Sequence, residues 1–184
     1  MNNVDALRFD AGSLSLNLVA TVGRRYGRAV ERLGSRERLR DWLVGVGLET
    51  RRALTDEDLA RVRRLREDLD ELFRSVAAGK RPPAGAIERV NGVVASCVPR
   101  LTTTGAGLAR PAGGPDPLGP VLGLVAADAI RILAGVERGD LRVCEADDCR
   151  MLYLAHGRRA RRWCSSERCG NRSRVASHRA RVRP

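Results

Sequence analysis

The sequence predicts a mainly α-helical protein. We expect an N-terminal domain of orthogonally packed helices, which can include a small β-hairpin, and a short C-terminal module with its own hairpin and a basic helix. Three observations predict this: apolar residues recur at helical spacing before residue 135, four of five cysteines fall within 26 residues, and arginines crowd the C-terminal end. We place the first domain at residues 1–138 and the module at residues 139–184.

The overall composition indicates a folded protein outside the membrane. Hydrophobic residues make up 43% of the 184 residues and aromatic residues only 3%, so we expect a core of Leu, Val and Ala. The chain has no run of 18 apolar residues, and its first residues lack the features of a signal peptide. We therefore expect no membrane partner and a cytoplasmic, nucleoid-associated location, where clustered cysteines are more often metal ligands than disulfides.

The positive charge is concentrated at the C-terminal end. The chain carries a net charge of +12, and Lys80 is its only lysine. Residues 141–184 hold 12 arginines against 4 acidic residues, which is a net charge of +8. A concentrated basic end favours a polyanionic partner, and a solvated basic tail is the plainer alternative.

Two helices are predicted before residue 48. Leu14, Leu18 and Val22 share a face of the first, which we expect to run from residue 14 to about residue 33. Ser35 is a suitable N-cap for the second helix, which ends at Gly47. The inward residues of this second helix follow at helical spacing: Leu39, Trp42, Leu43 and Val46.

Three further helices complete the first domain, and we assign their apolar stripes to the core. Thr55 and Asp58 form a capping box at the start of the third helix, which ends at Gly79. Its inward residues are Leu59, Val62, Leu65, Leu69, Leu72, Phe73 and Val76. The fourth helix follows two prolines, and its inward residues are Ile87, Val90, Val94 and Cys97. A short hairpin is expected within residues 99–110, and the fifth helix, over residues 118–134, buries Leu122, Val125, Ala129, Ile132 and Leu133.

The cysteines of the module have the spacing of a zinc site. Cys144, Cys149, Cys164 and Cys169 form two C-x4-C pairs that are separated by 14 residues. Such pairs lie on tight turns, which a hairpin can bring together around a tetrahedral metal. Few large apolar residues surround them, and structural zinc supplies roughly 10–16 kcal/mol of apparent binding free energy. We expect one Zn2+ per chain, with two disulfides or four free thiols as the alternatives.

A hairpin and a basic helix are predicted around these cysteines. Residues 151–154 have strand composition and can pair with residues 141–143. Ser165 can cap a first turn, Gly170 interrupts it, and Asn171 can cap the terminal helix, which gives a treble-clef-like arrangement. We expect two apolar residues of that helix, Val175 and Val182, to dock on the hairpin. The arginines expected to contact nucleic acid are Arg158, Arg159, Arg161, Arg162, Arg172, Arg174, Arg179, Arg181 and Arg183.

Both parts of the chain resemble known families. Residues 161–165 (Arg-Arg-Trp-Cys-Ser) and 169–172 (Cys-Gly-Asn-Arg) match the signature of the CGNR zinc finger family, which continues into a basic helix ending in Arg-x-Arg, here residues 179–181. Residues 16–21 (Leu-Asn-Leu-Val-Ala-Thr) resemble the opening of the helical ABATE domain, and residues 41–43 resemble its second helix. The resemblance implies a stress-related bacterial transcription regulator whose N-terminal domain senses a small ligand.

The chain departs from these families at particular positions. Ala20 stands where the ABATE motif has asparagine, so ligand sensing does not carry over if that asparagine binds the ligand. Ala155, His156 and Gly157 replace acidic, serine and asparagine residues of the family's hairpin. No residue involved in ligand binding is identified by the sequence.

The expected function is regulation of transcription through double-stranded DNA, with a helical sensor or dimerisation domain that would allow a homodimer. An RNA-binding or ribosome-associated zinc protein is the alternative, although the module offers few aromatic residues for stacking on single strands. A treble-clef nuclease, using His156, Asn171 or His178, is more remote, because four thiolates leave no open position on zinc. We therefore expect no enzyme activity.

Overall fold

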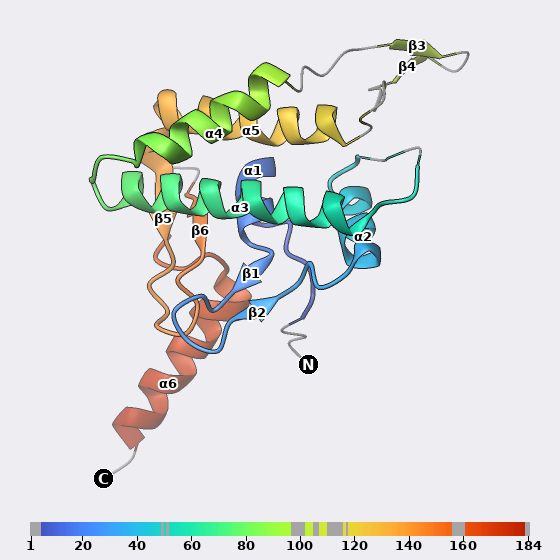
Figure 1. Ribbon diagram of the computed structural model, residues 1–184. Helices are drawn as coiled ribbons and strands as arrows, with labels where there is room; N and C mark the ends of the chain where they lie inside the picture. Colours follow the sequence, from blue (N-terminus) through green and yellow to red (C-terminus); the bar gives the residue numbers. More distant parts are fainter. Residues whose placement is uncertain are drawn as a thin grey trace.

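The computed structural model describes residues 5–48, 50, 52–96, 102–104, 107–109, 116, 118–155 and 161–182, without the side chains of 102–104, 107–109, 136, 180 and 182. Three long helices lie along one another: α3 (Asp56–Ala77), α4 (Ala84–Ser96) and α5 (Gly119–Ala134) (Figure 1). The short helices α1 (Leu14–Val19) and α2 (Arg36–Gly45) run steeply across the direction of α3 in this view. Helix α1 packs against both α3 and α5. No helix in the described ranges is both long and apolar enough to cross a bilayer.

Helix α3 begins and packs as the sequence predicts. The hydroxyl of Thr55 accepts a hydrogen bond from the Asp58 amide (3.2 Å), and the Asp58 carboxylate accepts one from the Thr55 amide (2.8 Å), which completes the capping box. The predicted apolar stripe is buried from Leu59 to Phe73, and Val76 is half-buried. Gly79 follows the helix with a φ of +66°, a left-handed conformation that favours glycine.

The first predicted helix is shorter than expected. It is capped by Ser13 and ends at Val19, and the chain then forms a two-residue ladder between β1 (Val22–Gly23) and β2 (Val30–Glu31). Val22, which the sequence predicts to continue the apolar face of this helix, therefore lies in a strand instead. The physical reason is a contact from α3: Arg66 is 4% exposed and binds both carboxylate oxygens of Glu31, at 2.7 and 2.8 Å.

The remaining helices of the first domain follow the predictions with one exception. Ser35 caps α2, whose residues Leu39, Trp42 and Leu43 are buried. Two three-residue strands, β3 (Thr102–Thr104) and β4 (Gly107–Ala109), pair antiparallel within the expected hairpin region. On α4, Val90 is buried but Ile87 is 40% exposed, because it lies at the edge of a surface pocket rather than in the core. Cys97 lies outside the described residues. Leu122, Val125, Ala129 and Ile132 of α5 are buried, and Leu133 is partly buried.

The C-terminal part contains the predicted hairpin. A 3-10 turn, η1 (Val136–Asp140), leads into β5 (Leu141–Val143), which pairs antiparallel with β6 (Leu152–Leu154). A π-helical turn, η2 (Ser166–Gly170), then continues directly into α6 (Asn171–Val182). The predicted interruption at Gly170 is therefore wrong: the Gly170 amide donates to the carbonyl of Ser165 (3.0 Å) and the helical path continues.

Helix α6 projects away from the rest of the molecule (Figure 1). Val175 is 42% exposed, so the prediction that it docks on the hairpin is wrong; the side chain of Val182 lies outside the described residues. The hairpin packs instead on the N-terminal helices, where Leu152, Tyr153 and Leu154 are fully buried. The described core is continuous from α1 to β6, and a domain boundary between residues 138 and 139 stays a prediction.

Candidate metal centre and nucleic-acid interface

The four predicted cysteines converge at one point of the structure. The sulfur atoms of Cys144, Cys149, Cys164 and Cys169 all lie within 4.8 Å of one another. The Cys149–Cys164 and Cys164–Cys169 sulfur distances are 3.7 and 3.5 Å. A tetrahedron with Zn–S bonds of about 2.3 Å has sulfur atoms roughly 3.8 Å apart, so this donor set fits one zinc ion. The cysteines are positioned to bind one metal ion, as expected for one Zn2+ per chain.

Local backbone structure positions each cysteine pair. Cys144 follows β5, and its amide donates to the carbonyl of Met151 across the hairpin (2.8 Å). Arg150, directly after Cys149, has a φ of +52°, which turns the chain back into β6. In the second pair, the Ser165 hydroxyl accepts a hydrogen bond from the Arg168 amide (3.3 Å) and holds the turn between Cys164 and Cys169. The first ligand pair thus lies in the turn of the hairpin and the second at the start of the helix.

The electrostatics of the cluster favour a cation at its centre. Hydrogen bonds from the neighbouring thiols, Cys144 first, hold the pKa of Cys149 well below its usual range, while hydrogen bonding with Cys144 and then with Cys149 raises the pKa of Cys164. Four sulfurs this close cannot all ionise without a compensating charge. A bound zinc would supply that charge, and with four thiolates it would have a structural role and no open position for water.

Two arginine side chains contact the ligand sulfurs. Arg8, from the N-terminal segment, places its Nη1 3.5 Å from the sulfur of Cys164, and Arg172 places its Nη2 3.4 Å from the sulfur of Cys169. Groups of this kind orient metal ligands and favour their thiolate forms. Sequence patterns could not identify Arg8, because 156 residues separate it from Cys164 and no local spacing connects them.

Several of the arginines expected to bind nucleic acid already have partners. Arg172 pairs with Asp148 (3.0 Å), and Arg162 pairs with Glu145 (2.6 Å). Arg161 lies over the ring of Tyr153 and donates to the carbonyl of Leu154 (3.0 Å). The positions of Arg158, Arg159 and Arg183 lie outside the described residues.

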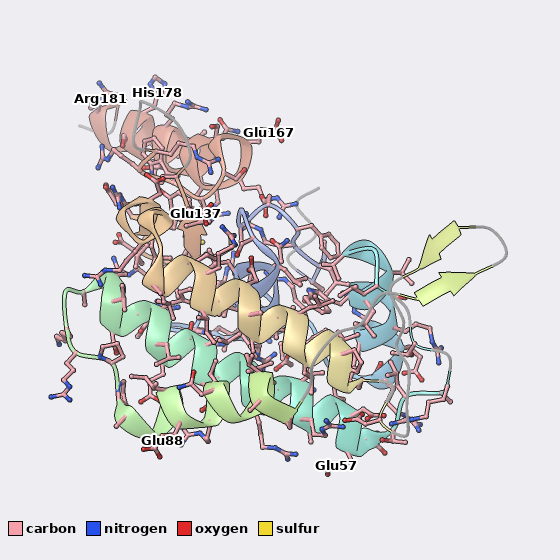
Figure 2. All side chains as sticks on the ribbon, turned by 90° about the horizontal axis from the view of Figure 1, so that it is seen from above. Glu57, Glu88, Glu137, Glu167, His178 and Arg181 are labelled. Atoms are coloured by element: carbon pink, nitrogen blue, oxygen red, sulfur yellow. The ribbon has the colours of Figure 1, made fainter. Side chains whose placement is uncertain are left out.

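The two faces of α6 differ in their electrostatic surroundings. One face, with Arg172 and Arg179, borders a groove whose opposite wall carries acidic residues of the hairpin turn: Glu145, Asp147 and Asp148. On the opposite face, which we call the outer face, Arg174 and Arg181 donate only to backbone carbonyls of their own helical segment. Figure 2 shows His178 and Arg181 pointing outward at the end of the molecule. Among the described residues, the outer face is the one without carboxylate partners.

The residues that resemble the ABATE motif have internal partners. The Asn17 side chain accepts a hydrogen bond from the Ala11 amide (3.0 Å), and the Thr21 hydroxyl donates to the carbonyl of Leu18 (2.6 Å). Ala20, which replaces the family's asparagine, is buried, and its carbonyl accepts a hydrogen bond from Arg32 (3.1 Å). In this chain the motif holds α1 and the following turn in place.

Comparison with protein families gives two matches. The profile of the ABATE family, described as "Putative stress-induced transcription regulator", matches residues 12–136. The profile of the CGNR zinc finger matches residues 141–182, which include all four clustered cysteines. A comparison with curated proteins finds no match.

Proposed function

The chain belongs to the ABATE family and carries a CGNR zinc finger, and we propose that it is a zinc-dependent transcription regulator that binds double-stranded DNA through the outer face of α6. The observation that carries the proposal is the projecting helix itself. Its outer face holds Arg174 and Arg181, whose charges no described carboxylate neutralises. A helix with this charge and freedom suits the groove and phosphates of a duplex.

The aromatic residues of the finger favour a duplex over a single strand. Single-strand recognition uses exposed rings on which bases stack. Within the described part of the finger, Tyr153 is fully buried and Trp163 is half-buried with the Arg162 guanidinium 5.2 Å from its ring. Neither ring offers a free stacking surface. Neither matched family is an enzyme family. Among the described residues, the four cysteines are the cluster whose side chains are close enough together to hold a metal ion.

The N-terminal domain is positioned to influence the finger. Strand β5 packs against α3, and the Leu154 amide of β6 donates to the carbonyl of Ala11 (2.9 Å). A rearrangement of the N-terminal helices would therefore reach the hairpin that carries Cys144 and Cys149. These contacts support a sensor role for the N-terminal domain.

The test is a salt titration of duplex DNA binding by the zinc-loaded full-length protein, followed by fluorescence anisotropy. Each neutralised phosphate contributes about −0.9 to the slope of log affinity against log salt, so Arg174 and Arg181 alone predict a slope of about −2, and every further arginine contact makes it steeper by about 0.9. Protein stripped of zinc is the control and should lose most of this binding. A duplex RNA that competes as well as duplex DNA would replace the proposal with an RNA-binding function.

A further inference from the structure

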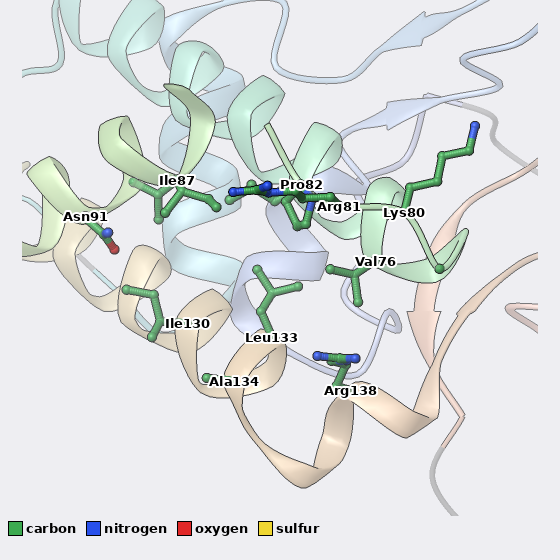
Figure 3. A pocket seen from close by; sticks show the side chains of 13 residues that line it. Val76, Lys80, Arg81, Pro82, Ile87, Asn91, Ile130, Leu133, Ala134 and Arg138 are labelled. Carbon is green, nitrogen blue, oxygen red and sulfur yellow. The ribbon is translucent and has the colours of Figure 1, made fainter. Parts of the chain in front are cut away.

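A pocket of about 490 Å3 opens between the ends of α3, α4 and α5, away from the metal centre. Its walls are mainly apolar, and Figure 3 shows these side chains gathered from the three helices. They include Leu72, Val76, Ile87, Val90, Ile130 and Leu133. The pocket has the size and lining that are typical of sites for small organic molecules. It also explains why Ile87, a large apolar residue, is left 40% exposed.

The polar residues at the rim of this pocket are cationic. Arg81 lies in the loop before α4, and Arg138 lies on η1 after α5. Neither arginine makes an ion pair or a side-chain hydrogen bond with another described residue. Figure 3 shows Arg138 beside Val76 and Leu133, whereas Lys80 extends away from the apolar side chains. The rim thus offers positive charge without an internal counterion.

We propose that this pocket binds a small amphipathic organic acid, with its hydrocarbon part against the apolar walls and its carboxylate on Arg138. An arginine can hold a carboxylate with two parallel hydrogen bonds, which gives both charge neutralisation and orientation. The apolar walls favour a hydrophobic body over a purely ionic ligand. This site rests on the sensor role proposed above and names the class of ligand that the sensor binds.

The position of Arg138 connects the pocket to the finger. Arg138 lies in η1, and β5 begins directly after this turn and leads to Cys144. The end of η1 is attached to the hairpin, because the Asp140 carbonyl accepts a hydrogen bond from the Ala155 amide (2.9 Å). A ligand that draws Arg138 toward the pocket therefore acts on the segment that supports the first metal-ligand pair.

The test uses decanoate as the probe, with isothermal titration calorimetry on the zinc-loaded full-length protein. Decanol and acetate are the controls for the tail alone and the head group alone. We expect decanoate to bind with one site per chain, decanol more weakly and acetate not measurably. Arg138→Gln should weaken decanoate binding about tenfold, the effect of losing one charge-assisted hydrogen bond, and should leave decanol binding unchanged. Decanol binding as tightly as decanoate would overturn the assigned ligand class.

Substitutions at two exposed apolar residues, one inside the pocket lining and one outside it, test where decanoate binds. Ile87→Glu places a carboxylate in the wall and should abolish decanoate binding, whereas Ile87→Gln, its neutral counterpart, should weaken it only a few-fold. Val44→Glu introduces the same charge at an exposed apolar residue of α2, outside the pocket lining, and should have no effect. If Ile87→Glu binds decanoate like the wild type, the ligand lies elsewhere and the proposal is wrong.

Two further outcomes separate this proposal from its alternatives. Sedimentation of the wild type and Ile87→Glu tests a second copy of the chain as the occupant: a dimer that the substitution dissociates would make the pocket an interface and overturn the ligand site. Duplex DNA binding is measured on the same samples. A protein that binds DNA but not decanoate refutes this inference alone, and a protein that binds decanoate but not DNA refutes the proposed function alone.

Discussion

The guanidinium of Arg8 contacts the sulfur of Cys164 at 3.5 Å, so a residue of the N-terminal segment lies against the metal centre of the finger. Arg8 is 6% exposed and is held in place by two hydrogen bonds to the carboxylate of Asp10, at 2.9 and 2.7 Å. Because the charge is fixed and shielded from water, it favours the thiolate form of Cys164 more than a mobile surface arginine would. We therefore expect the stability of the metal centre to depend on a residue outside the finger.

Replacement of Arg8 should weaken zinc binding without removing a ligand. We expect Arg8→Met to lower zinc affinity about 10- to 100-fold, the range found for groups that support metal ligands. Competition with a chromophoric chelator measures the affinity, and elemental analysis should still give one zinc per chain before the chelator is added. Arg40→Met is the control, because Arg40 is an exposed arginine of α2. Equal affinities in the two variants would show that the Arg8–Cys164 contact contributes nothing.

Loss of a zinc ligand should affect both parts of the chain. We expect Cys164→Ser to remove protection from hydrogen exchange in the finger, because the hairpin and η2 depend on the metal. The loss should extend to residues 8–20, because Ala11 bonds to Leu154 and α1 packs on β6. The amides in the middle of α3 should keep their protection, because they lie in the apolar core. Protection lost only after residue 140 would mean that the finger unfolds independently.

Two arginines within one turn of α6, Arg179 and Arg181, lie on its two opposite faces and distinguish them. We expect Arg181→Gln, on the outer face, to weaken duplex DNA binding and to flatten the salt slope by about 0.9, the contribution of one phosphate contact. Arg179→Gln removes the same charge from the side that borders the acidic groove and should change the slope much less. Zinc content should be the same in both proteins. A larger effect of Arg179→Gln would assign DNA binding to the opposite face.

Arg172→Gln should differ from both of these variants in its affinity for zinc. Arg172 pairs with Asp148 and contacts the sulfur of Cys169, so its removal should lower zinc affinity as well as net charge. We expect faster zinc loss to a chelator than in Arg179→Gln. Zinc retention equal in these two variants would contradict this role of Arg172.

The capping box of α3 predicts a defined dependence of stability on pH. Hydrogen bonds from Arg52 and then from Thr55 outweigh burial and lower the pKa of Asp58 to about 2. The folded pKa lies below the unfolded value of about 3.9, so this stabilisation is complete above that value and is lost as the pH falls toward 2. Asp58→Asn should cost about 1 kcal/mol near neutral pH. Urea unfolding should show the difference from wild type shrinking at about pH 3, and a constant difference would contradict the assignment.

Local sequence signals predicted the elements that local interactions define. The capping box at Thr55 and the regular stripe behind it fix α3, and Ser35 fixes the start of α2, because caps and helical periodicity act within a few residues. The spacing of Cys144 and Cys149, and of Cys164 and Cys169, predicted the metal centre for the same reason. In each case the residues that carry the signal also make the stabilising contact.

The incorrect predictions concern contacts between distant residues. The helical face of Leu14, Leu18 and Val22 ends early because Arg66, on α3, binds Glu31 and holds the intervening chain as a ladder. Val175 matched a docking pattern but is 42% exposed, because the hairpin packs on α1 and α3 instead. Arg8 had no local signal at all. Periodicity identifies a face of a helix and does not identify the surface against which that face packs.

The way α6 begins has a consequence for the free energy of DNA binding. The costly step in forming an isolated helix is nucleation of its first turn, and a free helix of about 12 residues is marginal in water. Helix α6 projects from the rest of the molecule (Figure 1), and its first turn continues η2, which contains the metal ligand Cys169. A zinc ion bound by Cys169 would therefore fix the first turn, and extending the helix beyond it would cost only the conformational entropy of the later residues. Metal loading would therefore favour helix formation, and a duplex bound as proposed would meet a helix that the metal has already started.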